Sequence, residues 1–164
     1  WRNNILEGHE FRQAQTAMAV EYLLRDGWSL AYPLPLFGPP WSAPMEFPVF
    51  QTVAAGFARV SGLPVDPACR LTSLAFFYLA LPALFMLLRD LPQPPHRRWL
   101  WLAAILVSPL YLFYSRAVMI ESTALCLGAW FLLAYVCAVD RGHRGWLAAA
   151  LPLGTGAGLA KVTT

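Results

Sequence analysis

Long apolar runs without a charged residue constrain this fold more than any other feature of the chain. Four apolar runs follow one another from residue 71 onward, at 71–88, 99–115, 118–139 and 145–160, and within them only Glu121 is charged. A helix needs about 20 mostly apolar residues to cross a bilayer, and each run approaches that length. Only 13% of the 164 residues are charged, against about 25% in soluble domains. The pattern predicts an all-α membrane protein with about four transmembrane helices.

The first part of the chain, 1–70, is more polar and contains two shorter helical patterns. From Phe11 onward, apolar side chains recur at i, i+3, i+7 and i+11, which predicts an amphipathic helix at about 9–26. A second helix is expected at about 46–62, which is too short to span. The stretch 28–48 contains six prolines, which forbid a regular helix there. We therefore expect an outer loop with two juxtamembrane helices, followed by the transmembrane part at 71–164.

Arginines predict which side of the membrane each loop faces. Arg89, Arg97 and Arg98 follow the first apolar run, and Arg141 and Arg144 follow the third. The positive-inside rule places both loops in the cytoplasm. By parity, a second set of charged residues meets on the non-cytoplasmic face: Glu10, Glu46, Arg116, Glu121 and Lys161. We expect a multi-pass protein of a bacterial inner membrane with its site facing outside.

The sequence allows two roles each for Glu10 and for the pair Arg116 and Glu121. His9-Glu10 begins the HExxH pattern of zinc proteases, but Gln13 stands where the second histidine is required. Glu10 can act as a general base or merely solvate the polar face of its helix, and spacing alone favours solvation. Arg116 and Glu121 fit either a functional pair at the edge of an apolar run or an ion pair that fixes two helix ends.

A glycine-rich stretch leads to Lys161 but does not form a phosphate loop. It matches neither GxGxxG nor the Walker A spacing, whereas Gly154 and Gly158 make a GxxxG pair that favours close helix packing. Lys161 can extend to the membrane surface or meet a phosphate as a point charge.

Composition argues against two other classes of site. The net charge of +3 comes mostly from arginines at segment ends. No basic stretch alternates with solvent-facing aromatic residues, so we expect no nucleic-acid partner. The three cysteines show no metal-binding spacing and are expected to be buried apolar residues.

Four motifs in this order resemble those of the C-type, polyprenyl-phosphate-sugar-dependent glycosyltransferases. That group includes the protein O-mannosyltransferases and the lipid A aminoarabinose transferases. Residues 9–13 occupy the place of an Asp-Glu-x-x-Tyr-like motif, and 41–48 that of a proline-aromatic stretch. Residues 114–121 take the place of an Arg-x-x-x-Asp-like motif, and Gly158-Leu159-Ala160-Lys161 that of a Gly-Leu-Ala…Lys sequence. The resemblance covers essentially the whole chain.

The chain departs from the family pattern at three positions. His9 replaces an aspartate, Gln13 replaces a tyrosine and Glu121 replaces an aspartate. The departures leave open whether Glu10 is the base. The resemblance implies the N-terminal third of a longer enzyme, without its first span and inactive in isolation.

The resemblance also implies a reaction and roles. A sugar would pass from a polyprenyl-phosphate donor to a lipid, glycan or protein acceptor at the non-cytoplasmic face of the bilayer. Glu10 would deprotonate the acceptor, and Arg116 and Lys161 would stabilise the leaving phosphate. Glu121 would orient the acceptor or pair with the cations. The remaining candidate substrate-binding residues are His9, Arg12, Gln13 and Glu46. No cofactor is implied, although some relatives use a divalent metal, so that question stays open.

An alternative from another class is a transporter or a non-catalytic subunit of a membrane complex. In such a protein Arg116 and Glu121 would pair or gate. Transporters commonly carry internal repeats, and none is visible here.

Overall fold

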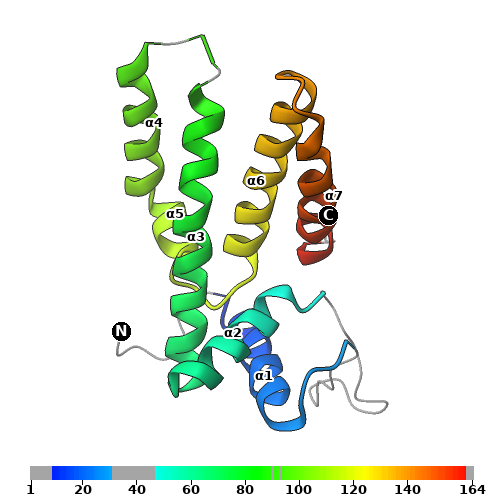
Figure 1. Cartoon of the computed structure of the whole chain (residues 1–164). Coiled ribbons are helices and arrows are strands. Elements are labelled where there is room, and N and C mark those ends of the chain that lie inside the picture. The colour runs from blue at the N-terminus through cyan, green and yellow to red at the C-terminus, as the bar shows by residue number, and fades with distance from the viewer. Residues whose placement is uncertain (1–8, 31–46, 90, 93, 162–164) are drawn as a thin grey trace.

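The computed structural model describes residues 9–30, 47–89, 91–92 and 94–161, and these residues form helices joined by turns, without strands (Figure 1). The elements, in chain order, are α1 (Glu10–Asp26), α2 (Val49–Ser61), α3 (Val65–Arg89), α4 (Pro95–Val107), α5 (Pro109–Tyr114), α6 (Glu121–Val139), the 3-10 helix η2 (Arg144–Trp146) and α7 (Leu147–Ala160). The predicted all-α class is confirmed for this part of the chain.

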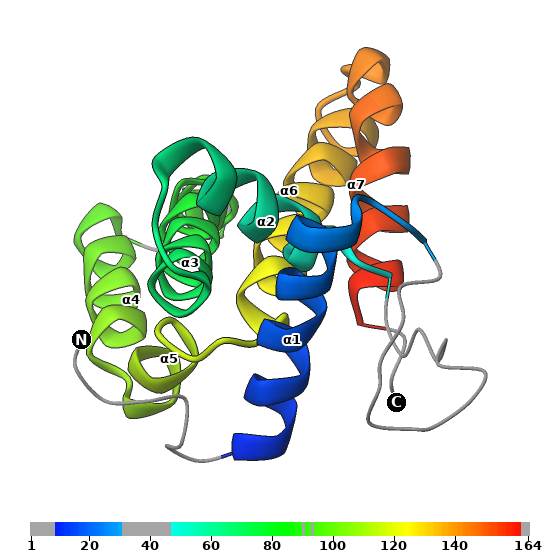
Figure 2. The same ribbon diagram turned by 90° about the horizontal axis from the view of Figure 1, so that it is seen from below.

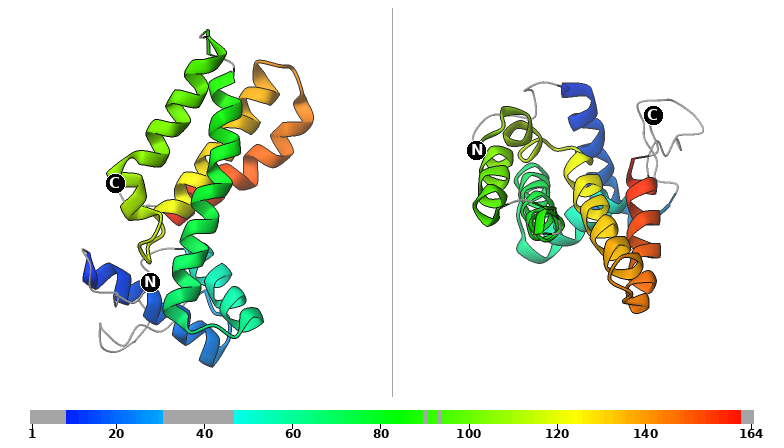
Figure 3. Two further views of the ribbon diagram at one scale, coloured as in Figure 1. Left: turned by 90° about the vertical axis from the view of Figure 1, so that its left-hand side faces the viewer. Right: turned by 90° about the horizontal axis from the view of Figure 1, so that it is seen from above.

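Four helices stand side by side in the order α4, α3, α6 and α7 (Figures 1 and 3). α6 packs against α3 on one side and α7 on the other, and α4 contacts α3. α1 and α2 lie across the end of this row where α3 and α6 begin and α7 ends, as the view from below shows (Figure 2). The short connection between α5 and α6 therefore lies next to α1 and α2.

α1 packs through small and medium-sized side chains. It begins after His9, which adopts a left-handed conformation (φ 52°), and ends at Gly27, whose positive φ of 89° is permissible because glycine lacks a Cβ. Its buried residues are Gln13, Thr16, Ala17, Ala19, Val20 and Leu23. The apolar stripe that starts at Phe11 is not this buried face, because Phe11 is 60% exposed.

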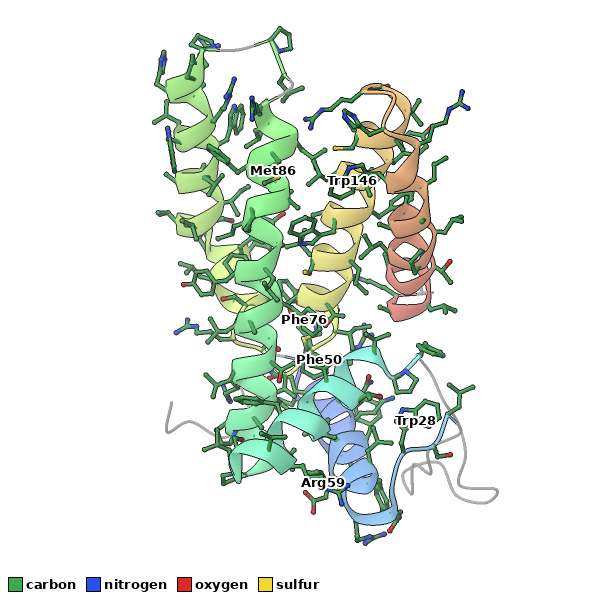
Figure 4. All side chains as sticks on the ribbon, viewed as in Figure 1. Trp28, Phe50, Arg59, Phe76, Met86 and Trp146 are labelled. Atoms are coloured by element: carbon green, nitrogen blue, oxygen red, sulfur yellow. The ribbon has the colours of Figure 1, made fainter. Side chains whose placement is uncertain are left out.

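One apolar core joins α1 and α2 to the row of four helices. Phe50 of α2 lies at its centre and is almost fully buried, together with Val20 of α1 and Val118 of the α5–α6 connection. Phe76 of α3 packs against this core, and Phe50 and Phe76 lie where the two parts of the molecule meet (Figure 4). Burial of a Val or Phe side chain contributes about 1.5–3 kcal/mol, so this core fixes α1 and α2 against the α5–α6 connection.

A second core lies between α3 and α6. Ala83 faces Ala129, Leu133 and Cys137, and all four are buried. The indole Nε1–H of Trp130 donates a hydrogen bond of 2.9 Å to the backbone oxygen of Leu79. These contacts align α6 along α3.

Among the residues that the structure describes, two helices, not the expected four, are long and apolar enough to cross a membrane: α3 and α6. The predicted run at 99–115 is divided, because α4 ends at Val107 and α5 begins at Pro109. Proline lacks an N–H group and disfavours a helical conformation in the preceding residue, and Ser108 has a ψ of 123°. The run at 145–160 consists of η2 and α7, which has only 14 residues.

Candidate functional site

The connection between α5 and α6 is held in place from two sides. The side-chain oxygen of Gln13, Oε1, accepts a hydrogen bond of 3.0 Å from the backbone N–H of Val118. The hydroxyl of Ser73 donates one of 2.8 Å to the backbone oxygen of Ala117. Gln13, Val118 and Ser73 are all buried. These two bonds fix the segment that leads into Glu121, the first residue of α6.

A small cavity lies between α1, α2 and this segment. The described residues that line it are Arg12, Gln15, Thr16, Ala19, Gln51, Met119, Ile120 and Glu121. Its volume is about 10 Å³, which is close to the minimum that one water molecule requires. The cavity therefore accepts a single small group and not a ring.

Two oxygen atoms at this cavity are buried and have no hydrogen-bond partner: Gln51 Oε1 and Glu121 Oε2. Arg12 and Gln15, which also line the cavity, already have interaction partners. A buried polar atom without a partner costs about 1–3 kcal/mol. The two oxygens thus create a need for a hydrogen-bond donor inside the cavity.

The other oxygen of the Glu121 carboxylate lies near a cation. Lys161 Nζ is 3.9 Å from Glu121 Oε1, and the two side chains are 42% and 18% exposed. An ion pair of this length and exposure contributes little to stability, about 0–1 kcal/mol. The backbone N–H of Phe47 donates a hydrogen bond of 3.4 Å to the oxygen of Leu159, which brings the start of α2 to the same end of α7.

A second cavity lies on another side of Glu121, between α3, α5 and α6. Its volume is about 120 Å³, and it is lined by Phe77, Leu110, Tyr111, Tyr114, Ser115, Glu121, Ser122 and Leu125. Its wall is largely apolar, with Glu121 as the charged residue. Glu121 therefore borders both a small polar cavity and a larger apolar one.

The structure brings several of the predicted site residues together. Arg12 and Glu121 line the same small cavity, and Lys161 lies beside Glu121. Gln13 is adjacent, but its oxygen is engaged by Val118, so Gln13 shapes the site instead of facing an open space.

Other predicted residues lie outside the two cavities or outside the described chain. Glu10 is exposed on the first turn of α1, on a different side of the helix from Arg12. Arg116 is exposed, and its Nε donates a hydrogen bond of 3.3 Å to the oxygen of Leu112. The ring of His9 stacks against Tyr114 with centroids 6.4 Å apart. Glu46 lies outside the described residues.

Gln51 is a candidate site residue that was not predicted from the sequence. The signal was present, because Gln51 shares one face of α2 with Ala54, Ala55 and Ala58, and a polar residue on the buried face of a helix needs a partner. Whether Gln51 lines a cavity depends on how α1 packs against α2, and the sequence pattern of α2 alone does not show this.

Within the described ranges, no three His, Cys, Asp or Glu side chains are grouped in a way that suits a metal ion. A scan against protein-family models, a search of curated proteins and a search of solved structures each find no match.

Proposed function

We propose that this chain belongs to a multi-pass membrane glycosyltransferase that uses a polyprenyl-phosphate-linked sugar. One observation carries the proposal: residues from three motifs far apart in the sequence meet at one place. Arg12 comes from the first motif and Glu121 from the third, and both line one small cavity. Lys161 comes from the fourth motif, and its Nζ lies 3.9 Å from Glu121 Oε1. A carboxylate beside a cation at the end of an apolar helix row suits transfer of a group away from a lipid phosphate.

Exposed apolar side chains support placement in a bilayer. Only 28% of the most apolar window of α3 and 44% of that of α6 are buried, unlike core helices of soluble proteins. Large apolar side chains are also exposed on the neighbouring helices, among them Trp99, Trp101, Val107 and Leu151. Such a surface is typical of contact with lipid or with further helices. In our proposal α3 and α6 span a bacterial inner membrane, and α1 and α2 lie at its outer surface.

Glu121 is the carboxylate that the geometry favours as the general base. It borders both cavities, and its Oε2 has no partner. In the proposed reaction, an acceptor hydroxyl or amine gives its proton to Glu121 while its oxygen or nitrogen bonds to the anomeric carbon of the sugar. The bond from that carbon to the phosphate oxygen breaks, and its electron pair stays on the phosphate. Lys161 then stabilises the negative charge.

The family resemblance implies Glu10 as the base, but the surroundings of Glu10 differ from those of Glu121. Glu10 is exposed and lines neither cavity. A general base must come within hydrogen-bond reach of the proton that it removes. We therefore assign this role to Glu121 and keep Glu10 as the comparison in the experiment below.

The apolar cavity beside Glu121 suits the lipid part of the donor. Phe77, Leu110 and Leu125 supply apolar walls, and Tyr111 and Tyr114 add aromatic ones. Ligand pockets commonly combine such walls with a few polar groups that fix orientation. The first isoprene unit of a polyprenyl phosphate would contact this wall, with its phosphate toward Lys161.

The proposal is tested with the full-length protein in lipid nanodiscs, supplied with radiolabelled polyprenyl-phosphate sugars and panels of lipid, glycan and protein acceptors. Glu121→Gln should lower sugar transfer by about 10²–10⁴-fold, the usual contribution of a general base. Glu10→Gln and Glu21→Gln, both at exposed positions of α1, should change it less than threefold. If the wild-type protein transfers no sugar, the proposed function is wrong. If only Glu10→Gln abolishes transfer, the assignment of the base is wrong.

One observation favours a transporter as the second candidate. The break between α4 and α5 at Ser108 resembles the discontinuous helices that form transporter binding sites. Leu110 and Tyr111, just after the break, line the apolar cavity. Uptake of labelled sugar lipids into proteoliposomes, without any transfer to an acceptor, would support this candidate.

A further inference from the structure

Two buried glutamines near one core have different surroundings. Gln13 is 3% exposed, and its oxygen holds the backbone of Val118. Gln51 is 2% exposed, yet its Oε1 has no partner and its side chain lines the small cavity. A buried amide oxygen almost always has a partner. Gln51 therefore points to a ligand group that enters this cavity.

The two unpartnered oxygen atoms at the cavity determine which chemical group can bind there. Gln51 Oε1 is an acceptor, and an ionised Glu121 carboxylate can only accept. An ionised phosphate also offers only acceptor oxygens, so it gains no hydrogen bond from either atom. A hydroxyl or an amine donates hydrogen and satisfies at least one of them.

Size gives an independent restriction. At about 10 Å³, the cavity holds one group no larger than a water molecule. A sugar ring or a phosphate is too large, whereas a single terminal hydroxyl or amine fits. Both restrictions select the same kind of group.

We propose that this cavity binds the nucleophilic hydroxyl or amine of the acceptor, and that Gln51 is the positioning residue that holds it against Glu121. The inference rests on the proposed glycosyl transfer and adds a residue and a substrate group to it. Gln51 accepts a hydrogen bond from the group, or from a neighbouring donor on the same acceptor, while Glu121 takes the reacting proton.

The experiment uses methanol and methylamine as surrogate acceptors, because each carries one polar group of the required size. The full-length protein in nanodiscs is supplied with a labelled polyprenyl-phosphate sugar that the wild type uses, and initial rates are measured against acceptor and donor concentration. Gln51→Leu should raise the acceptor KM about tenfold, as for the loss of one hydrogen bond worth about 1.4 kcal/mol. The donor KM should not change. Gln51→Glu, whose carboxylate also accepts, should restore the acceptor KM to within threefold of the wild type.

Ser61→Ala, at an exposed position of α2, is the matched control and should behave as the wild type. An unchanged acceptor KM in Gln51→Leu would mean that the cavity holds only water, and would overturn the inference. A raised donor KM would assign the group to the donor sugar, which also overturns it. If Gln51→Glu does not restore the acceptor KM, the shape of the Gln51 side chain matters and not its ability to accept a hydrogen bond, and the proposed role of Gln51 is wrong. All three outcomes require an active wild type, so they differ from a failure of the proposed function itself.

Discussion

Replacing Gln13 by methionine removes the hydrogen bond from Val118 that fixes the candidate site. The two side chains have similar length, but the thioether is only a weak acceptor. The backbone N–H of Val118 then loses its 3.0 Å partner in a fully buried position. An orphaned buried donor costs about 1–3 kcal/mol. For a chain of this size, 1 kcal/mol corresponds to about 2–4 °C in Tm, so we expect a Tm lower by about 4–8 °C for a loss of 2 kcal/mol.

Two measurements check this prediction in detergent micelles. Thermal unfolding gives the shift in Tm, and hydrogen–deuterium exchange of a peptide covering 115–120 reports on the Val118 amide itself. Glu21→Met is the matched control, because it places methionine at an exposed position of the same helix and should change stability by less than about 0.5 kcal/mol. If Gln13→Met unfolds at the same temperature as this control, and exchange at 115–120 is unchanged, the bond does not hold the α5–α6 connection.

Two further predictions concern packing between helices, and both use unfolding in detergent. Ser73→Ala removes a buried hydroxyl that donates to the backbone at 2.8 Å and should destabilise the protein by about 1 kcal/mol. Ser61→Ala, the control, should be neutral. Equal effects of the two substitutions on the free energy of unfolding would contradict the role of Ser73. A Cβ at Gly154 would lie 2.8 Å from the ring of Phe131, whereas one at Gly158 would meet nothing within 4 Å. Gly154→Ala should therefore destabilise by about 1 kcal/mol or more, and Gly158→Ala should stabilise by up to about 1 kcal/mol; effects of the same sign would contradict this packing.

The sequence predicted where helices form better than where they break. The helices expected at 9–26 and 46–62 are observed as Glu10–Asp26 and Val49–Ser61. Each is followed by a glycine with a positive φ, Gly27 and Gly62, and a glycine after a helix is a local signal for its end. Proline shows where local signals fail. Pro82 lies inside α3 and Pro152 inside α7, whereas the chain breaks before Pro109. Whether a proline interrupts a helix depends on what packs around it, and one sequence does not contain that information.

The same limit applies to the site. Charge at the ends of apolar runs was sufficient to select Glu121 and Lys161, which lie 3.9 Å apart. Gln51 was not selected, and Glu10 was selected although it lines neither cavity. Which side chains face a cavity depends on the rotation of α1 and α2 about their axes, which a sequence pattern does not give. The core residues of α1 set that rotation, and they turn Arg12 and not Glu10 toward the cavity. Small buried residues such as Ala17 and Ala19 give little signal in a sequence.

The two oxygen atoms of the Glu121 carboxylate lie in different surroundings. Its Oε1 lies near Lys161, and its Oε2 is buried without a partner. The second oxygen can thus accept a hydrogen bond from a donor. Because Lys161 is 42% exposed, in the proposed reaction it would have room to move toward the phosphate. In the proposed reaction, Glu121 would therefore act as the base at the end of the apolar helix row, and Lys161 would meet the negative charge of the leaving group.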